Sequence, residues 1–287
     1  MNLVILGTTP FTPPQLAALR SLLPGHDMSV DDALSHIGSV RIADVTPSSA
    51  PHAQLETLCT QHRWDYALLP EGRRLTDFRL VAMDMDSTLI TIECVDEIAD
   101  YCGLKAEVSA ITEAAMRGEI KDFNESLTRR VALLKGLDAG ALERVYQDRL
   151  RLSPGAESML LGVQAQGLKT LLVSGGFTYF TERLKPRLKL DATRANTLEI
   201  VDGRLTGRVL GEIVNAEVKA RAVREMCEQI GAAPHQAIVI GDGSNDLQMM
   251  AAAGLSIAFR AKPVVRAQAS VAFNHVGLDA LLRLFDA

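Results

Sequence analysis

The alternation of apolar and polar residues changes along the chain near residue 77. Before that point, short β-like runs alternate with apolar residues at helical spacing. The predicted order is strand, helix, two strands, helix and strand, at Leu3–Leu6, residues 12–23, Val30–Ile37, Val40–Val45, residues 49–62 and residues 64–70. This βαββαβ order is typical of a small α+β ferredoxin-like domain, expected over 1–76. The polar stretch Glu71–Asp77 is the predicted linker.

From Phe78 onward the pattern alternates buried strands with helices. Four apolar runs that end in turn or charged residues predict strands at residues 78–84, 168–176, 236–243 and 254–259. Continuous apolar runs of this kind are typical of parallel strands buried on both faces. The region 77–287 therefore predicts a doubly wound α/β core. A β-hairpin is predicted to turn at Asp202-Gly203, a strong two-residue turn signal.

The first and second of these strands are separated by about eighty residues, most of them with a helical pattern. A single crossover helix does not need that length. We therefore expect a helical cap inserted into the core at about 95–166.

Several polar side chains follow the predicted core strands. The carboxyl ends of parallel strands meet at one edge, where ligands bind in α/β sheets. The side chains expected at that edge are Asp84, Asp86, Thr88, Ser174, Gly175, Asp242, Asn245 and Asp246. Crowded carboxylates need a cation to offset their charge, and hard oxygen ligands suit Mg²⁺.

The residue types at this edge indicate phosphoryl transfer to an aspartate. Backbone N–H groups of the Ser174–Gly176 turn can donate to phosphate oxygens, and Lys219 can offset their charge. Asp84 is the candidate nucleophile, forming an aspartyl-phosphate. Asp86 can protonate the leaving oxygen and later accept a proton from water.

Four motifs in the chain resemble, in order and spacing, those of the haloacid dehalogenase (HAD) phosphatase superfamily: DMDST at 84–88, SGG at 174–176, Lys219 and GDGSND at 241–246. The pattern is most similar to the phosphoserine phosphatases of that superfamily. The resemblance implies a HAD (Rossmann-like) core and Mg²⁺ held by the Asp84 side chain, the Asp86 backbone carbonyl and Asp242. It places Asp246 beside the metal and Thr88 in a supporting role, and it assigns Ser174, Gly175, Lys219 and Asn245 to the bound phosphoryl group.

The same resemblance implies O-phospho-L-serine as the substrate, hydrolysed to L-serine and phosphate as the last step of serine biosynthesis. Such a substrate needs an anion for its ammonium group and a guanidinium for its carboxylate. The residues that match the family's are Glu93 for the amino group, Arg130 for the carboxylate, and Phe123 and Met116 around the substrate. Arg129 is adjacent to Arg130 and is expected to point elsewhere, since neighbouring helical residues do not share a face.

Two other functions remain open on the sequence. A phosphotransferase of the same superfamily could pass the phosphoryl group to homoserine, and an amino-acid-responsive binding protein could carry a vestigial phosphatase site. The N-terminal βαββαβ order resembles ACT-like domains, which bind amino acids or pair into homodimers, and a packing role without a ligand fits it equally well.

Composition excludes several other classes of partner. The chain has 287 residues, 47% of them hydrophobic, and a formal net charge of -5, without the long basic run that nucleic acid or an anionic membrane needs. Its four cysteines show no CxxC spacing, which favours reduced thiols and a cytoplasmic location. No secretory signal and no run of eighteen apolar residues is present, so membrane spanning is not expected.

Overall fold

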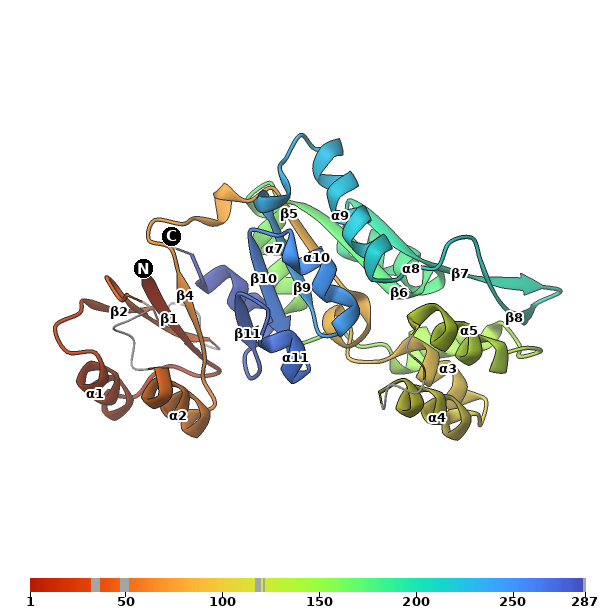
Figure 1. Cartoon of the computed structure of the whole chain (residues 1–287), viewed down its shortest axis with the longest axis horizontal. Helices are drawn as coiled ribbons and strands as arrows, with labels where there is room; N and C mark the ends of the chain where they lie inside the picture. The colour runs from red at the N-terminus through yellow and green to blue at the C-terminus, as the bar shows by residue number, and fades with distance from the viewer. Residues whose placement is uncertain (32–36, 47–51, 117–119, 121, 286–287) are drawn as a thin grey trace.

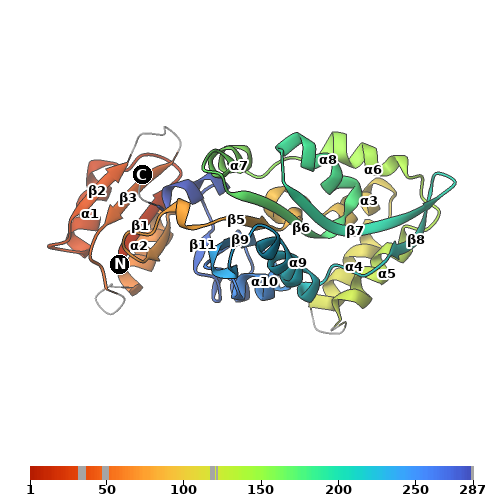
Figure 2. The ribbon, with the colours of Figure 1, turned by 90° about the horizontal axis from the view of Figure 1, so that it is seen from above.

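The computed structural model describes residues 1–31, 37–46, 52–116, 120 and 122–285. Figures 1 and 2 show three parts in a row, with the N-terminal domain at one end, a large sheet in the middle and a group of helices at the other end. Within the described ranges, no helix has both the length and the apolar character that crossing a membrane requires.

The N-terminal domain has the predicted ferredoxin-like order. Its elements are β1 (Asn2–Gly7), α1 (Pro13–Leu22), β2 (Met28–Asp31), β3 (Gly38–Ile42), α2 (His52–His62) and β4 (Asp65–Leu69). The strands form an antiparallel sheet in the order β2-β3-β1-β4.

The two middle strands differ from the predicted bounds. The first begins at Met28, two residues before the predicted start at Val30, and it is described as far as Asp31. The rest of the predicted range Val30–Ile37 falls mostly on residues 32–36, which lie outside the described part. The second spans Gly38–Ile42 instead of Val40–Val45. It begins early because Gly38 pairs with Gly7, and it ends early because the chain turns at Asp44, whose φ is 58°.

Both faces of this small sheet are buried. Leu3 and Ile5 of β1 share a hydrophobic cluster with Leu19 of α1 and Leu55 of α2. The alternate residues Val4 and Leu6 point the other way, since side chains alternate along a strand, and belong to the main cluster of the large domain. The N-terminal domain is therefore packed against the rest of the chain and not merely tethered to it.

The middle part is the predicted doubly wound core. Its strands are β5 (Leu80–Met83), β6 (Lys169–Phe177), β7 (Ala192–Val201), β8 (Arg204–Leu210), β9 (Ala237–Gly241), β10 (Leu255–Phe259) and β11 (Val271–Phe273). They form one seven-stranded sheet in the order β11-β10-β9-β5-β6-β7-β8, and only β8 runs antiparallel to its neighbour. The predicted hairpin turns at Asp202 and Gly203, both with positive φ. The short strand β11 was not predicted.

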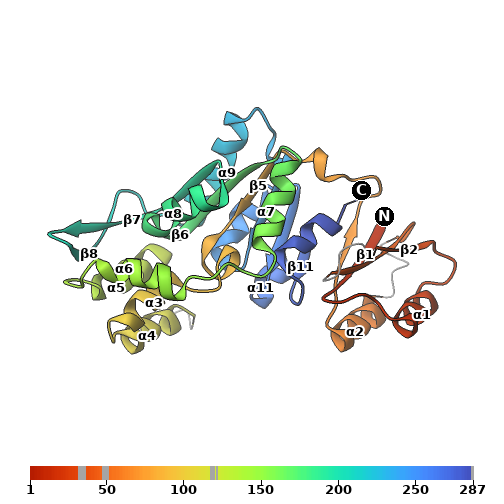
Figure 3. The same cartoon turned by 180° about the vertical axis from the view of Figure 1, so that it is seen from behind.

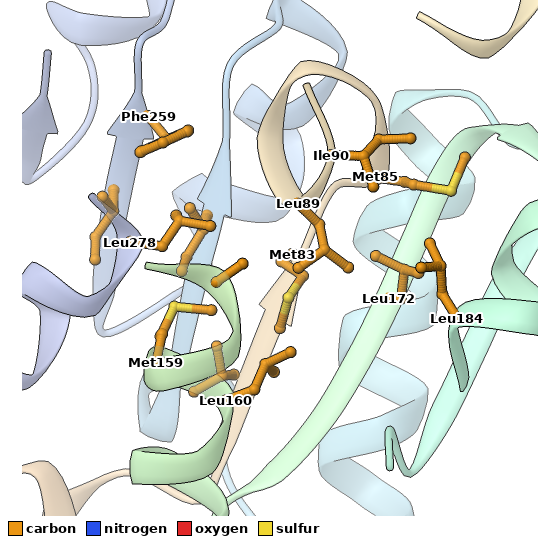
Figure 4. Close-up of a cluster of buried hydrophobic side chains, with 14 of the residues drawn as sticks. Met83, Met85, Leu89, Ile90, Met159, Leu160, Leu172, Leu184, Phe259 and Leu278 are labelled. Atoms are coloured by element: carbon orange, nitrogen blue, oxygen red, sulfur yellow. The ribbon is translucent and has the colours of Figure 1, made fainter. Parts of the chain in front are cut away.

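Helices cover both faces of the core sheet. On one face lie α7 (Ala156–Ala165) and α8 (Thr178–Leu188), and on the other α9 (Ala216–Gln229), α10 (Leu247–Ala251) and α11 (Pro263–Arg266). Figure 3 shows α7 in front of the sheet, and Figure 4 shows Met159 and Leu160 of α7 beside Met83 of β5. The strands are thus buried on both sides, as their continuous apolar runs predict.

The inserted helices form a cap beyond the carboxyl ends of the strands. They are α3 (Cys94–Tyr101), α4 (Lys105–Met116), α5 (Phe123–Leu133) and α6 (Gly140–Arg144), followed by a π-type turn at Val145–Arg149. Helix α7, which lies inside the predicted range of 95–166, packs on the core sheet instead. We propose that the cap ends near Leu152, before α7.

The two chain segments that join cap and core are hydrogen-bonded to each other. The Thr91 N–H donates to the Arg151 carbonyl at 2.9 Å, and the Ser153 N–H donates to the Leu89 carbonyl at 2.9 Å. A third connection comes from the β7–β8 hairpin, where Leu205 exchanges backbone hydrogen bonds with Gly136 and Leu137 of the cap. The cap is therefore held against the core at two separate places.

A buried carboxylate joins the N-terminal domain to the core. Asp65, at the start of β4, is 2% exposed. Its carboxylate accepts hydrogen bonds from the backbone N–H groups of Asn274, His275 and Val276, at 2.9, 2.8 and 3.0 Å. Hydrogen bonds to a charged acceptor are stronger than neutral ones, and buried donors left without an acceptor are costly.

We expect Asp65→Ala to lower the free energy of unfolding by about 3 kcal/mol, because three buried or half-buried N–H groups lose their charged acceptor. Urea denaturation followed by circular dichroism measures the change. The matched control is Asp27→Ala, in the same domain, where the side chain is exposed. The control should stay within about 0.5 kcal/mol of the parent. Equal stability of the two variants would contradict a joining role for Asp65.

Candidate active site

The chain turns sharply where β5 ends, and the turn carries two buried aspartates. The Asp84 N–H donates to the Ile240 carbonyl of β9 at 3.0 Å, which fixes the strand end. The five-residue turn at Met85–Leu89 follows, with Ser87 at a φ of 57°. Asp84 and Asp86 are 5% and 9% exposed. Both carboxyl groups are thus buried just beyond the carboxyl end of β5.

Lys219 supplies the positive charge beside these aspartates. It lies in the first turns of α9, a helix whose N-cap residue Asn215 accepts a hydrogen bond from the Val218 N–H. Its side chain has no exposure, and its Nζ lies 2.7 Å from Asp84 Oδ1 and 2.8 Å from Asp246 Oδ1. Burial alone would lower the pKa of Lys219, but the charges of Asp246 and Asp84 outweigh it and raise that pKa, so the ammonium stays charged.

Both carboxylate oxygens of Asp246 accept hydrogen bonds from neighbouring residues. Its Oδ1 bonds to Lys219, and its Oδ2 accepts the backbone N–H groups of Asp242 and Gly243 at 3.1 and 3.0 Å. A Cβ at Gly241 would lie 2.4 Å from Asp246 Oδ2, so this close approach requires glycine. Asp246 therefore positions both Lys219 and the loop after β9.

The acidic residues at this edge need more positive charge than Lys219 supplies. Carboxylate oxygens of Asp84, Asp242 and Asp246 lie within 4.8 Å of one another. Burial, and then the charge of Asp246, raises the pKa of Asp242 to about 6. Burial also raises the pKa of Asp84, against the effect of Lys219. A cation among these oxygens would relieve the repulsion, so the cluster fits a metal ion bound by hard oxygen ligands.

Thr88 supports this cluster. Its hydroxyl donates to Asp242 Oδ1 at 3.0 Å, and its side chain has no exposure. The contact connects the turn after β5 to the loop after β9. The sequence assigned Thr88 a supporting role without its partner, and the structure identifies that partner as Asp242.

Asp86 is set up differently from Asp84. Its Oδ2 accepts the Cys94 N–H at 3.2 Å, while its buried Oδ1 has no hydrogen-bond partner among the described residues. Burial, and then the charge of Glu93, raises the pKa of Asp86 to about 8. The raised pKa favours the protonated form, which is the form a general acid needs.

The Ser174–Gly176 turn lies beside the turn that follows β5. The Ser174 hydroxyl accepts the Gly176 N–H at 2.8 Å. A Cβ at Gly176 would lie 3.0 Å from both Asp86 Oδ2 and Ser174 Oγ, so both side chains lie close to this glycine. A Cβ at Gly175 would lie 2.9 Å from the Phe123 ring of the cap. The turn thus contacts both the segment around Asp86 in the core and Phe123 in the cap.

Charged residues of the cap face the same edge of the sheet. Glu93 accepts a hydrogen bond from the Ser87 hydroxyl at 2.7 Å. Burial raises the pKa values of Glu93 and Asp96, and the positive charge of Arg130 opposes the rise at both. Arg129, by contrast, pairs with the exposed Glu125 at 2.5 Å on the outside of α5, as expected for the adjacent helical residue.

Two predicted residues have no described contact in the site. Met116 is the last residue of α4, and its side chain lies outside the description. Asn245 is half-buried and packs on its own loop, since a Cβ at Gly243 would lie 2.2 Å from Asn245 Oδ1.

One buried residue at the site was not predicted. Asn196 of β7 is 1% exposed, donates to the Gly175 carbonyl at 2.8 Å and accepts the Val214 N–H at 2.8 Å. It connects the Ser174–Gly176 turn to the segment that leads into α9 and Lys219. Asn196 directly precedes the stretch that predicts the β-hairpin, and no sequence motif marks it. Its partners, which a buried polar group needs, are supplied by the fold.

Comparison with known proteins agrees with this geometry. A model of the family described as "haloacid dehalogenase-like hydrolase" matches residues 78–254, and the chain belongs to this family of hydrolases. Within it, the chain is 58% identical over 215 residues to a phosphoserine phosphatase of Polaromonas sp., covering 74% of this chain and 91% of the relative. The predicted superfamily and fold are therefore confirmed.

Solved structures extend the likeness to the whole chain. A probable phosphoserine phosphatase of Vibrio cholerae superposes with a TM-score of 0.84 and 37% identity, covering 99% of this chain and 86% of that one. A phosphoserine phosphatase solved as an analogue of its phospho-aspartyl intermediate has a TM-score of 0.68 and 35% identity, over 73% of this chain and 99% of that one. The ferredoxin-like fold of the first domain agrees with the first of these.

Proposed function

We propose that this chain is an Mg²⁺-dependent phosphoserine phosphatase that hydrolyses O-phospho-L-serine to L-serine and phosphate. The observation that carries the proposal is the pairing of a buried Asp84 with a buried Lys219, beside a second buried aspartate, Asp86, whose raised pKa favours its protonated form. Every predicted catalytic position holds a chemically competent residue with the expected neighbours. This argues against a binding protein with a vestigial site.

The first half-reaction transfers the phosphoryl group to Asp84. A carboxylate oxygen of Asp84 attacks phosphorus, the bond to the serine oxygen breaks, and Asp86 gives its proton to that oxygen. Lys219 and the hydroxyl and N–H groups near Ser174 offset the charge on the phosphoryl oxygens. L-Serine leaves, and Asp84 carries the phosphoryl group.

The second half-reaction restores the protein. Asp86, now a carboxylate, takes a proton from water while the water oxygen attacks phosphorus. The bond from phosphorus to Asp84 breaks, which releases phosphate and returns Asp84 to its carboxylate form. Asp86 ends the cycle protonated, as it began.

Mg²⁺ is the metal that we assign to the acidic cluster. Its ligands would be the side chains of Asp84 and Asp242 and the backbone carbonyl of Asp86, since both oxygens of Asp246 are already used. Oxygen ligands and few carboxylates suit Mg²⁺. When bound, it supplies positive charge to the phosphoryl oxygens and lets the Asp84 carboxylate approach them.

The cap supplies the recognition of serine. Glu93 would pair with the substrate ammonium group and Arg130 with its carboxylate, while Phe123 covers the site above Gly175. Met116 and Asn245 stay predicted contacts. The relation of the N-terminal domain to ACT-like domains, its use in a homodimer and the cytoplasmic location also stay predictions, the last supported by four free cysteines.

Asp84→Asn should reduce phosphoserine turnover by more than about a thousandfold, because an amide does not attack phosphorus. Phosphate release from the purified variant measures the effect, and circular dichroism checks its fold. Turnover close to that of the parent would remove Asp84 as the nucleophile.

Arg130→Ala should lower kcat/KM for phosphoserine by about a hundredfold, because the substrate carboxylate loses a charge-assisted bond. The same change should have little effect on a small phosphate ester without a carboxylate. Arg129→Ala is the matched control, one residue away on the outer face, and should leave both substrates unaffected. Equal losses on both substrates in Arg130→Ala would contradict the carboxylate role.

Chelation of divalent cations should abolish activity, and added Mg²⁺ should restore it. Asp242→Asn should raise the Mg²⁺ concentration needed for half-maximal activity by about tenfold or more, because a charged ligand is lost. Asp202→Asn, an isosteric change in the exposed hairpin turn, is the control and should not shift that concentration. Full activity in chelator would refute the metal assignment.

A further inference from the structure

A second cationic pocket lies at the junction of the N-terminal domain and the core. Its volume is about 450 Å³, and its lining residues are Arg63, Arg260, Ala261, Arg266, Asn274 and His275. Arg63 comes from the N-terminal domain, just after α2, whereas the others follow β10 and β11 at one edge of the core sheet. None of them belongs to the candidate active site.

The lining of this pocket holds three guanidinium groups and an imidazole but no carboxylate. Elsewhere, arginines pair with carboxylates, as Arg194 does with Glu225 at 3.2 Å. Across the described parts of the chain, no ion pair of this kind involves the three pocket arginines. Arg266 has only Asn274 Oδ1 as a side-chain acceptor, at 3.3 Å. All three arginine side chains are exposed, so water screens part of their repulsion, and the buried Asp65 carboxylate accepts the N–H groups of Asn274 and His275. An anion bound between the guanidinium groups would offset the repulsion that remains.

The backbone adds an independent observation. Arg63 and Arg260 have φ values of 55° and 46°, in the left-handed region that favours glycine. Arg63 occupies the position after a helix end where glycine is common, and the Arg260 N–H is held by the Phe273 carbonyl at 2.7 Å. At both positions the chain accepts an unfavourable backbone conformation, and at both the side chain adds positive charge to the same pocket.

We propose that this pocket binds a small oxyanion, with a phosphate-bearing small molecule as its ligand class. Guanidinium groups recognise phosphate through paired N–H donors, and three of them suit a dianion. The pocket holds three arginines on a chain of net charge -5, and so few cations are too few for a long polyanion. A bound anion would contact residues of both domains and so hold the junction together.

Trp64 offers a built-in probe of this pocket. It is the chain's one tryptophan, it follows Arg63 directly, and it is 6% exposed and stacked on His62 with ring centroids 4.6 Å apart. Titration of the full chain with inorganic phosphate should change Trp64 fluorescence in a saturable way. Sodium chloride at matched ionic strength should not. A response that never saturates, or that chloride reproduces, would overturn the proposal.

Arg260→Gly tests the site without endangering the fold. Glycine relieves the positive φ, so the variant should be at least as stable as the parent, yet its fluorescence response should need about tenfold more phosphate. Lys189→Gly is the matched control, because Lys189 is an exposed cation with a φ of 54° outside the pocket. It should keep the parent's response. Equal midpoints in the two variants would refute the role of Arg260.

Phosphate is also the product of the proposed reaction, so the two sites must be separated. Ser174→Ala removes a hydroxyl of the candidate active site and should leave the Trp64 response unchanged. Loss of the response in that variant would assign it to the active site and overturn the pocket. This readout does not depend on turnover, so failure of the proposed function and failure of this inference give different results.

Discussion

The buried ammonium group of Lys219 is the interaction on which the rest of the site depends. A charged lysine with no exposure is tolerated only when carboxylates surround it, and Asp84 and Asp246 do so at 2.7 and 2.8 Å. The second oxygen of Asp246 accepts hydrogen bonds from the loop after β9. Helix α9, this loop and the end of β5 are therefore held together by Lys219 and Asp246. The arrangement leaves Asp84 with partial compensation only. Because the negative charge of Asp84 is only partly compensated, a cation can bind beside it, and a phosphoryl group can then bind to that cation.

The cap completes a site that the core cannot complete alone. The core supplies groups that act on phosphorus, whereas the groups suited to an amino acid, Glu93 and Arg130, come from the cap side. Contact between Phe123 and Gly175 brings the two sets together. Asn196 links the same Gly175 by hydrogen bonds to the segment that leads into α9, and the Phe123 ring of the cap packs on the turn at Gly175.

Much of this was predictable from the sequence, and the exceptions have physical causes. Strands buried on both faces give unbroken apolar runs, so β5, β6, β9 and β10 were found, and the side chains at their ends followed from the topology of parallel sheets. Strand β11 has three residues, too few for a pattern. Asn196 and its partner Gly175 are 21 residues apart in the sequence, and Thr88 and its partner Asp242 are 154 residues apart. Such pairings are created by folding and leave no local periodicity.

The burial of both faces of the N-terminal sheet restricts how two copies of the chain could associate. Val4 and Leu6 already pack against the core, and β4 at one edge of the sheet contacts β11. Among the described residues, the surfaces that do not pack against the core are the outer side of α1 and α2 and the edge of the sheet at β2, three of whose four residues are exposed. Pairing at β2 would join two sheets into one continuous antiparallel sheet, whereas pairing through the helices would leave both sheets separate. Face-to-face stacking of the two small sheets is excluded by the molecule's own core.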